Sequence, residues 1–172
     1  DETVPTVSLA TSSATISENG GSSTITFALS GPINGVVSAI LNYSNTATLG
    51  NDFSGSSTIS IPAGETSATF TVTSIDDSIY EGDETSTITI SSVDNSNVSI
   101  SSSNSVTLTI TEDETVPRVS LAASGNSIAE ESGGGIIFTA SIDQVASVDL
   151  TVTLAITVKS RSQSYSPNVP SS

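Results

Sequence analysis

Apolar and small polar residues alternate with a period of two in segment after segment of this 172-residue chain. In residues 105–111, Val106, Leu108 and Ile110 fall on one face, and threonines fill most positions of the other. A period of two is typical of β-strands, and β-branched threonine suits a pleated surface. The segments with this pattern are residues 4–10 continuing through 14–17, 23–30, 36–44, 57–61, 67–75, 85–93 and 105–111.

Strands at this spacing, separated by Gly-, Pro- and Asn-rich turns, predict a specific all-β architecture. We expect an antiparallel two-sheet β-sandwich of the immunoglobulin-like type. The chain has no Cys and no Trp, so it lacks the disulfide and tryptophan that mark true immunoglobulin domains.

Part of the sequence returns after 112 residues. DETVPTVSLA at residues 1–10 recurs as DETVPRVSLA at residues 113–122, with one difference in ten. A period of this length fits tandem sandwich domains and is too long for a solenoid repeat. The second copy has material for about three strands and no counterpart of residues 49–111. We therefore expect a complete domain at 1–114, a partial second sandwich at 115–158 and a polar Ser/Pro-rich tail at 159–172.

The chain is strongly acidic, with a formal net charge of −15. No basic residue occurs in residues 1–117. Phosphate binding requires Lys and Arg, so this composition excludes nucleic acid as a natural partner.

No apolar run approaches the roughly 20 residues that span a bilayer, so we expect no membrane insertion. The start at DETVP, without an initiator Met or a signal peptide, predicts a processed product or a fragment.

The segment SIDDSIYEGDET, residues 74–85, concentrates negative charge. It contains Asp76, Asp77, Glu81, Asp83 and Glu84. Carboxylates this close cannot all ionise without repulsion, which leaves raised pKa values, full solvation or a bound cation. Ca²⁺ takes six to eight oxygen ligands and suits such a set, while Mg²⁺ remains an alternative. Zn²⁺ is disfavoured because the chain has no His or Cys, and the spacing is not that of an EF-hand.

Sandwich topology adds ligands from other loops, because successive loops alternate between the two ends of a sandwich. The end that carries Asp76 and Asp77 should also carry Glu18, Asp52 and the closing run 112–114. The opposite end should carry mostly neutral turns. This segregation of acidic loops favours a cation site at one end of the first domain.

Four separated motifs in this order resemble the Calx-beta domain family. They are Asn51-Asp-Phe, Ile59–Ile61 followed by Pro62-Ala-Gly, Ile75-Asp-Asp-Ser-Ile-Tyr-Glu-Gly-Asp-Glu, and Leu108-Thr-Ile-Thr-Glu-Asp-Glu. The resemblance covers residues 4–114 well and 116–158 in part. It implies Ca²⁺ as the cofactor, held by the loops at one end of the sandwich.

Carried over by this resemblance, the metal ligands are Glu18, Asp52, Asp76, Asp77, Glu81 and Asp113, with Glu84, Glu112 and the Ile79 carbonyl as further candidates. Exchanger-type members have an Asp where this chain has Ser78, and an all-Asp closing run in place of 112–114. Fewer or weaker sites than in those members are therefore expected. The alternative is that the acidic loops are only solvated, which we favour for Glu130 and Glu131.

Catalysis is not expected, because the chain has no His and few aromatic residues to line a sugar cleft. Asn42-Tyr-Ser and Asn97-Val-Ser match the N-glycosylation sequon, so surface glycans are a candidate modification.

The sequence favours an extracellular or cell-surface structural module, a Ca²⁺-stiffened building block of a filament, stalk or adhesin. The alternative is a Ca²⁺-sensing regulatory domain of a larger membrane or adhesion protein.

The partial second repeat leaves an apolar face uncovered, so we expect it to be completed. The candidates are its own first domain, an adjacent repeat, or head-to-tail strand complementation by another copy of the chain, and the alternative is a chain cut in mid-repeat. VPTVSLA, residues 4–10 of the next copy, is the expected donor in the last case.

Overall fold

The computed structural model describes residues 3–128 and 133–157 of the chain. No helix in these residues is long and apolar enough to cross a bilayer. In chain order the strands are β1 (Thr6–Thr11), β2 (Thr15–Ser17), β3 (Ser22–Leu29), β4 (Val37–Ser44), β5 (Phe53–Ser54), β6 (Thr58–Ile61), β7 (Ser67–Ser74), β8 (Ile79–Tyr80), β9 (Glu84–Val93), β10 (Ser99–Ile100), β11 (Ser105–Thr111), β12 (Val119–Ala123), β13 (Phe138–Ile142) and β14 (Val145–Ala146).

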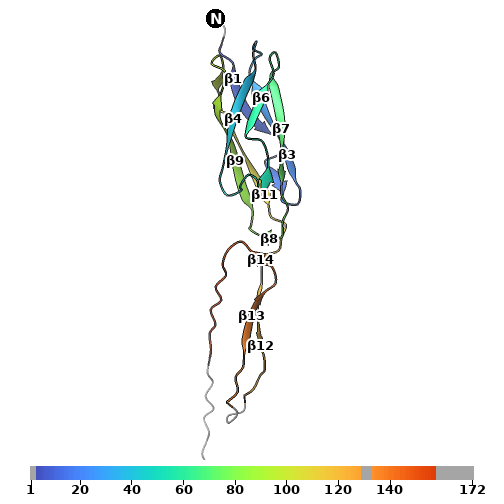
Figure 1. The fold of residues 1–172 in the computed structure, drawn as a ribbon, viewed down its shortest axis with the longest axis vertical. Helices are drawn as coiled ribbons and strands as arrows, with labels where there is room; N and C mark the ends of the chain where they lie inside the picture. Colours follow the sequence, from blue (N-terminus) through green and yellow to red (C-terminus); the bar gives the residue numbers. More distant parts are fainter. Residues whose placement is uncertain (1–2, 129–132, 158–172) are drawn as a thin grey trace, which may run out of the picture.

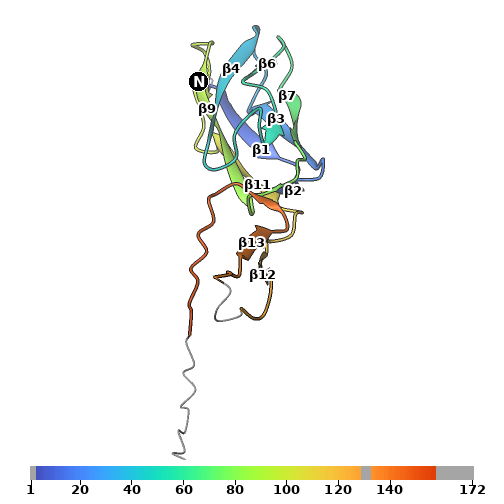
Figure 2. The same ribbon diagram turned by 60° about the horizontal axis from the view of Figure 1, so that its bottom comes forward.

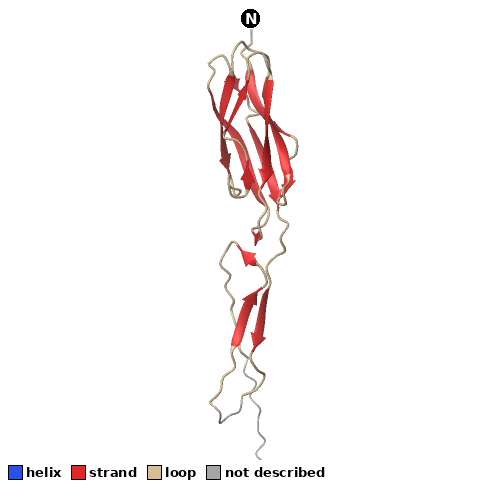
Figure 3. Ribbon diagram, turned by 45° about the vertical axis from the view of Figure 1, so that its right-hand side comes forward, coloured by secondary structure: helices blue, strands red, loops and turns tan. Residues whose placement is uncertain are grey.

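Residues 6–111 form two five-stranded sheets that pack face to face (Figures 1 and 3). The first sheet has the order β10-β1-β3-β7-β5, and the second has the order β2-β11-β9-β4-β6. This arrangement confirms the all-β two-sheet sandwich. All seven of the segments with period-two alternation supply strands to it.

The sequence predicted antiparallel sheets, but both sheets are mixed. β1 runs parallel to β10, and β2 runs parallel to β11. The opening segment, expected as one strand, leaves the first sheet after Thr11 and joins the second without reversing direction. The crossing is held by the buried Ser23 hydroxyl, which lies 2.8 Å from Thr11 Oγ1 and accepts the N–H of Ser13 at 3.1 Å.

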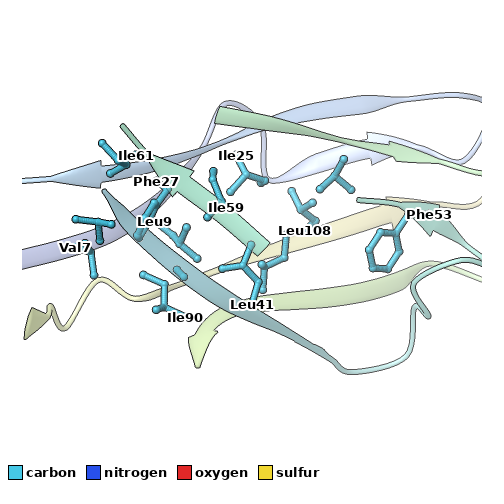
Figure 4. Close-up of a cluster of buried hydrophobic side chains, with 14 of the residues drawn as sticks. Val7, Leu9, Ile25, Phe27, Leu41, Phe53, Ile59, Ile61, Ile90 and Leu108 are labelled. Carbon is cyan, nitrogen blue, oxygen red and sulfur yellow. The ribbon is translucent and has the colours of Figure 1, made fainter. Parts of the chain in front are cut away.

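The hydrophobic core lies between the two sheets (Figure 4). Val7, Ile25, Phe27 and Ile88 have no exposed surface, and each occupies an inward position of the alternating pattern. Phe53 closes the core at one end and packs against Tyr43, with ring centroids 5.4 Å apart. The strands are therefore fixed by burial, and the chemistry of the molecule is left to the loops at its ends.

The second repeat begins with a hairpin that copies one from the first. β12 pairs with β13 in the register Val119 opposite Ile142, as Val7 lies opposite Leu29 between β1 and β3. A second sandwich is not formed within the described residues. Residues 151–157, which belong to the expected three-strand second copy, lie in an extended run that pairs with no strand among the described residues (Figures 1 and 2). Because a strand needs a hydrogen-bonded neighbour, the alternating pattern alone could not create one.

Candidate metal centre

The acidic loops meet at the end of the first sandwich that faces the second repeat, near β8 in Figure 1. Backbone hydrogen bonds of 2.9 Å join them. The N–H of Glu18 donates to the carbonyl of Thr111, and the N–H of Ile75 donates to the carbonyl of Asp52. Loops far apart in sequence are thus held together by the strand ends that they follow.

The turn after β2 places Glu18 inside this end. Glu18 is only 8% exposed. The turn is tight because Gly21 returns its N–H to the carbonyl of Ser17 at 2.9 Å, and a Cβ at Gly21 would lie 2.4 Å from that same oxygen. Only glycine fits this close approach, so Gly21 makes possible the tight turn in which Glu18 is buried.

Two groups of carboxylates form at this end. The first, called the Glu18 cluster here, comprises Glu18, Glu112, Asp113 and Glu114. The second, called the Asp52 cluster, comprises Asp52, Glu81 and Glu84. In each cluster, one carboxylate oxygen from every member lies within 4.8 Å of those of the others. These separations allow one cation to be shared within each cluster.

Glu112 links the two clusters. Its carboxylate accepts the N–H groups of Glu81 and Gly82, both at 2.6 Å, and that of Glu114 at 3.0 Å. The N–H of Glu112 donates to Asp83 at 3.1 Å. The closing run of the domain is therefore bonded directly to the acidic loop that follows β7.

Burial and mutual repulsion raise several pKa values in these clusters. Burial raises the pKa of Glu18 to about 8, and its hydrogen bond and proximity to Glu112 add to the effect. Burial, followed by the negative charges of Asp52 and Glu81, raises the pKa of Glu84 to about 7. Burial also raises the pKa of Glu81. Without a cation, this end of the protein therefore retains protons near neutral pH.

The pKa values of Glu114 and Glu112 shift in opposite directions. A hydrogen bond to Glu112 is the main reason why the pKa of Glu114 rises to about 7. The pKa of Glu112 falls because the hydrogen bonds from Glu114 and from the backbone together outweigh its burial. Glu114 Oε2 is buried and has no hydrogen-bond partner. A buried polar oxygen without a partner is costly, and a bound cation would satisfy it.

The six ligands expected from the sequence are distributed unevenly. Glu18 and Asp113 lie in one cluster, and Asp52 and Glu81 lie in the other. Asp76 and Asp77 belong to neither. Asp77 instead accepts the N–H of Ile79 at 2.7 Å, although its charge still contributes to the raised pKa of Glu18 and Glu81.

The clusters also include members beyond those six. Glu84 and Glu112 were further candidates in the sequence, and Glu114 was not among them. A signal for Glu114 was present, because residues two apart in an extended segment lie on the same side. Because Glu112 was already a candidate ligand, Glu114 could have been predicted to lie beside it.

This donor set fits a hard divalent cation. All seven side chains in the two clusters offer carboxylate oxygens, and none offers nitrogen or sulfur. Residues 1–117 contain no basic side chain to neutralise them. Ca²⁺ accepts such ligands with flexible geometry, while Mg²⁺ requires a near-ideal octahedron.

A comparison of the chain with models of protein families shows which family it belongs to. The model of the Calx-beta domain matches residues 1–133, more than three quarters of the chain. The chain belongs to the Calx-beta family. A comparison with curated proteins finds no match.

Solved structures of Calx domains share the fold of this Calx-beta protein. One is the crystal structure of the apo form of the Calx CBD1 domain, with a TM-score of 0.52 and 24% identity. It matches 63% of this chain and 98% of its own. Another is the crystal structure of calcium binding domain CBD12 of CALX1.1, with a TM-score of 0.51 and 27% identity. That match covers 58% of this chain and 41% of the CBD12 chain.

Proposed function

We propose that this Calx-beta domain binds Ca²⁺ at the end of its first sandwich, through the Glu18 cluster and the Asp52 cluster. The observation that carries the proposal is the convergence of seven carboxylates from four loops of residues 1–117, a segment whose sequence contains no Lys or Arg. The calcium binding domain among the similar structures supports the choice of metal.

Ca²⁺ would supply positive charge that replaces the retained protons. Glu18 and Glu114 would ionise on binding, because a cation within reach favours the charged form of a carboxylate. Glu112 would hold the 81–82 backbone in place through its two 2.6 Å hydrogen bonds. Binding would therefore tie the loop that contains β8 to the end of β11.

The biological role that we propose is structural. The domain serves as a Ca²⁺-stiffened β-sandwich of an extracellular or cell-surface filament, stalk or adhesin, and it has no catalytic activity. Tandem repetition, a Ser/Thr-rich surface and strong acidity support this role. The location of the clusters at the boundary between the repeats also supports it, because a cation there would stiffen the joint.

A second candidate role is a Ca²⁺-sensing regulatory domain of a larger membrane or adhesion protein. The similarity to the Calx domains favours this alternative. The two roles require different affinities for Ca²⁺. A structural extracellular module needs only millimolar Ca²⁺ affinity, whereas a sensor requires a dissociation constant of roughly 10⁻⁷–10⁻⁵ M.

Thermal unfolding with 1 mM Ca²⁺ and with chelator tests the binding. A site with a dissociation constant near 10⁻⁵ M would add about 2.7 kcal/mol, and one near 10⁻³ M would add only about 0.4 kcal/mol. The Glu112→Gln variant should lose most of this gain. Glu65→Gln, at the opposite end of the sandwich, is the matched control and should keep it. An equal melting temperature with Ca²⁺ and with chelator at neutral pH would refute the proposal.

A further inference from the structure

The hairpin β12–β13 has one apolar face that no other described part of the chain covers. Val119, Leu121, Phe138 and Ile142 lie on this face, and each is 44–57% exposed. The opposite face is polar, and there the hydroxyls of Ser120 and Ser141 lie 2.8 Å apart. The hairpin thus has the two-sided pattern of a sandwich sheet without the second sheet.

The first repeat shows what such a face requires. Val7 and Leu9 correspond to Val119 and Leu121, and they are 0% and 5% exposed. Their face is covered by the second sheet, and the free edge of β3 is taken by β7. The uncovered hairpin therefore needs a facing sheet and one strand at the edge of β13.

The extended run 151–157 is the second free segment. Val152, Leu154 and Ile156 alternate with polar or small residues, as Ala68, Phe70 and Val72 do in β7. These three side chains are 44%, 54% and 87% exposed. An open cavity of about 460 Å³ lies in the segment that joins the hairpin to this run, and its lining includes Ile142, Val148 and Leu150.

We propose that two copies of the chain associate through residues 119–157, with the apolar hairpin faces packed together and run 151–157 of each copy paired with the edge of β13 in the other. This exchange uses both free segments of both copies. A contact of this kind is isologous, so it closes as a symmetric dimer. The proposal does not depend on Ca²⁺ binding.

Area and charge favour a second copy as the partner. The seven partly exposed apolar side chains offer on the order of 600 Å² of surface per copy, which is the lower end of what one side of a standard stable interface buries. Residues 118–172 have a formal charge of only −1, whereas residues 1–117 carry −14. Two second repeats can therefore meet without the repulsion that would separate two first domains.

The donor expected from the sequence, residues 4–10, is engaged elsewhere. Most of it is in β1, which lies between β3 and β10, and Val7 is fully buried there. Donating it would open the first sandwich, whereas run 151–157 pairs with no strand in the part of the chain that the structure describes. The structure therefore favours the C-terminal run as the exchanged strand.

Light scattering coupled to size exclusion, over a range of concentrations, tests the association. The whole chain should have twice the monomer mass of 17.3 kDa. Leu121→Glu, on the apolar face, should raise the dissociation constant at least about tenfold, the effect of losing roughly 1.4 kcal/mol. Ala122→Glu adds the same charge to the opposite face and should leave the dimer intact.

A second pair of variants tests the exchanged strand. Leu154→Glu should weaken the dimer, and Thr153→Glu should not. Hydrogen exchange should show protection of the 119–142 amides that rises with protein concentration. Three outcomes would overturn the proposal: a monomer at every concentration, protection independent of concentration, or assembly beyond a dimer that is lost when residues 1–12 are deleted.

Discussion

At the residue scale, Glu18 is the most informative side chain because it is a buried acid among other acids. Its pKa in the folded protein is about 8, whereas an unfolded chain would have a value near 4.5. The folded state therefore binds this proton more tightly. Without Ca²⁺, the contribution of Glu18 to stability is fully present below about pH 4.5 and is lost as the pH rises toward 8.

Glu18→Gln should remove this pH dependence. In the presence of chelator, the variant should be more stable than the parent at pH 9, by up to a few kcal/mol, because one pKa unit corresponds to about 1.4 kcal/mol. At pH 4 the two proteins should be similar. Urea unfolding at both pH values measures the difference. Parallel stability curves for parent and variant from pH 4 to pH 9 would contradict the assignment.

Glu112 and Asp77 give a sharper comparison of ligand sets. Glu112 lies in a cluster and bonds to the loop of the other, whereas Asp77 lies in neither and caps its own loop. Calorimetric titration should show a large loss of Ca²⁺ affinity for Glu112→Gln and a smaller one for Asp77→Asn. Removal of the Asp77 charge should also stabilise the metal-free protein slightly, because it relieves repulsion. Abolished binding in Asp77→Asn would instead favour the ligands carried over from the resemblance.

At the element scale, the turn between β2 and β3 controls where Glu18 lies. A methyl group at Gly21 would collide with the Ser17 carbonyl, whereas one at Gly31 meets no heavy atom within 4 Å. Gly21→Ala should therefore destabilise the protein by about 1–3 kcal/mol and weaken Ca²⁺ binding. Gly31→Ala is the matched control and should change neither. Unfolding in urea and a Ca²⁺ titration of both variants provide the comparison. Wild-type behaviour of Gly21→Ala would mean that the turn can relax.

Strands and loops differed in how well the sequence predicted them. Alternation located the long strands because burial on one face is what selects that pattern, as Ile25 and Leu108 show. It could not locate the crossing after Thr11, because inward-facing residues are apolar in both sheets and the pattern does not show which sheet a segment joins. The acidic end was predictable from topology. The division into two clusters was not, because Asp77 and Glu112 are oriented by backbone N–H groups that no pattern of residue types reveals.

At the scale of the whole molecule, the two repeats meet where the acidic loops lie. β14 of the second repeat pairs with β8 through two residues each, and the Ser147 N–H donates to the Tyr80 carbonyl at 3.4 Å. This pairing is short, so it depends on how well β8 is held. Asp77 precedes β8 and Glu81 follows it, which places this strand inside the loop that Ca²⁺ would fix.

Ca²⁺ should therefore stiffen the joint between the repeats. Solution scattering of the Leu121→Glu variant, chosen to keep the chain monomeric, should give a longer and narrower distance distribution with Ca²⁺ than with chelator. Hydrogen exchange at residues 79–80 and 145–147 should slow in parallel, because the strand pairing opens less often. Glu84→Gln should need more Ca²⁺ for the same change, and Glu65→Gln should respond as the parent does. If Ca²⁺ raises the melting temperature while the distance distribution and exchange at the joint stay the same, the ions stabilise the sandwich alone. The stiffening role would then be lost, although the metal site would remain.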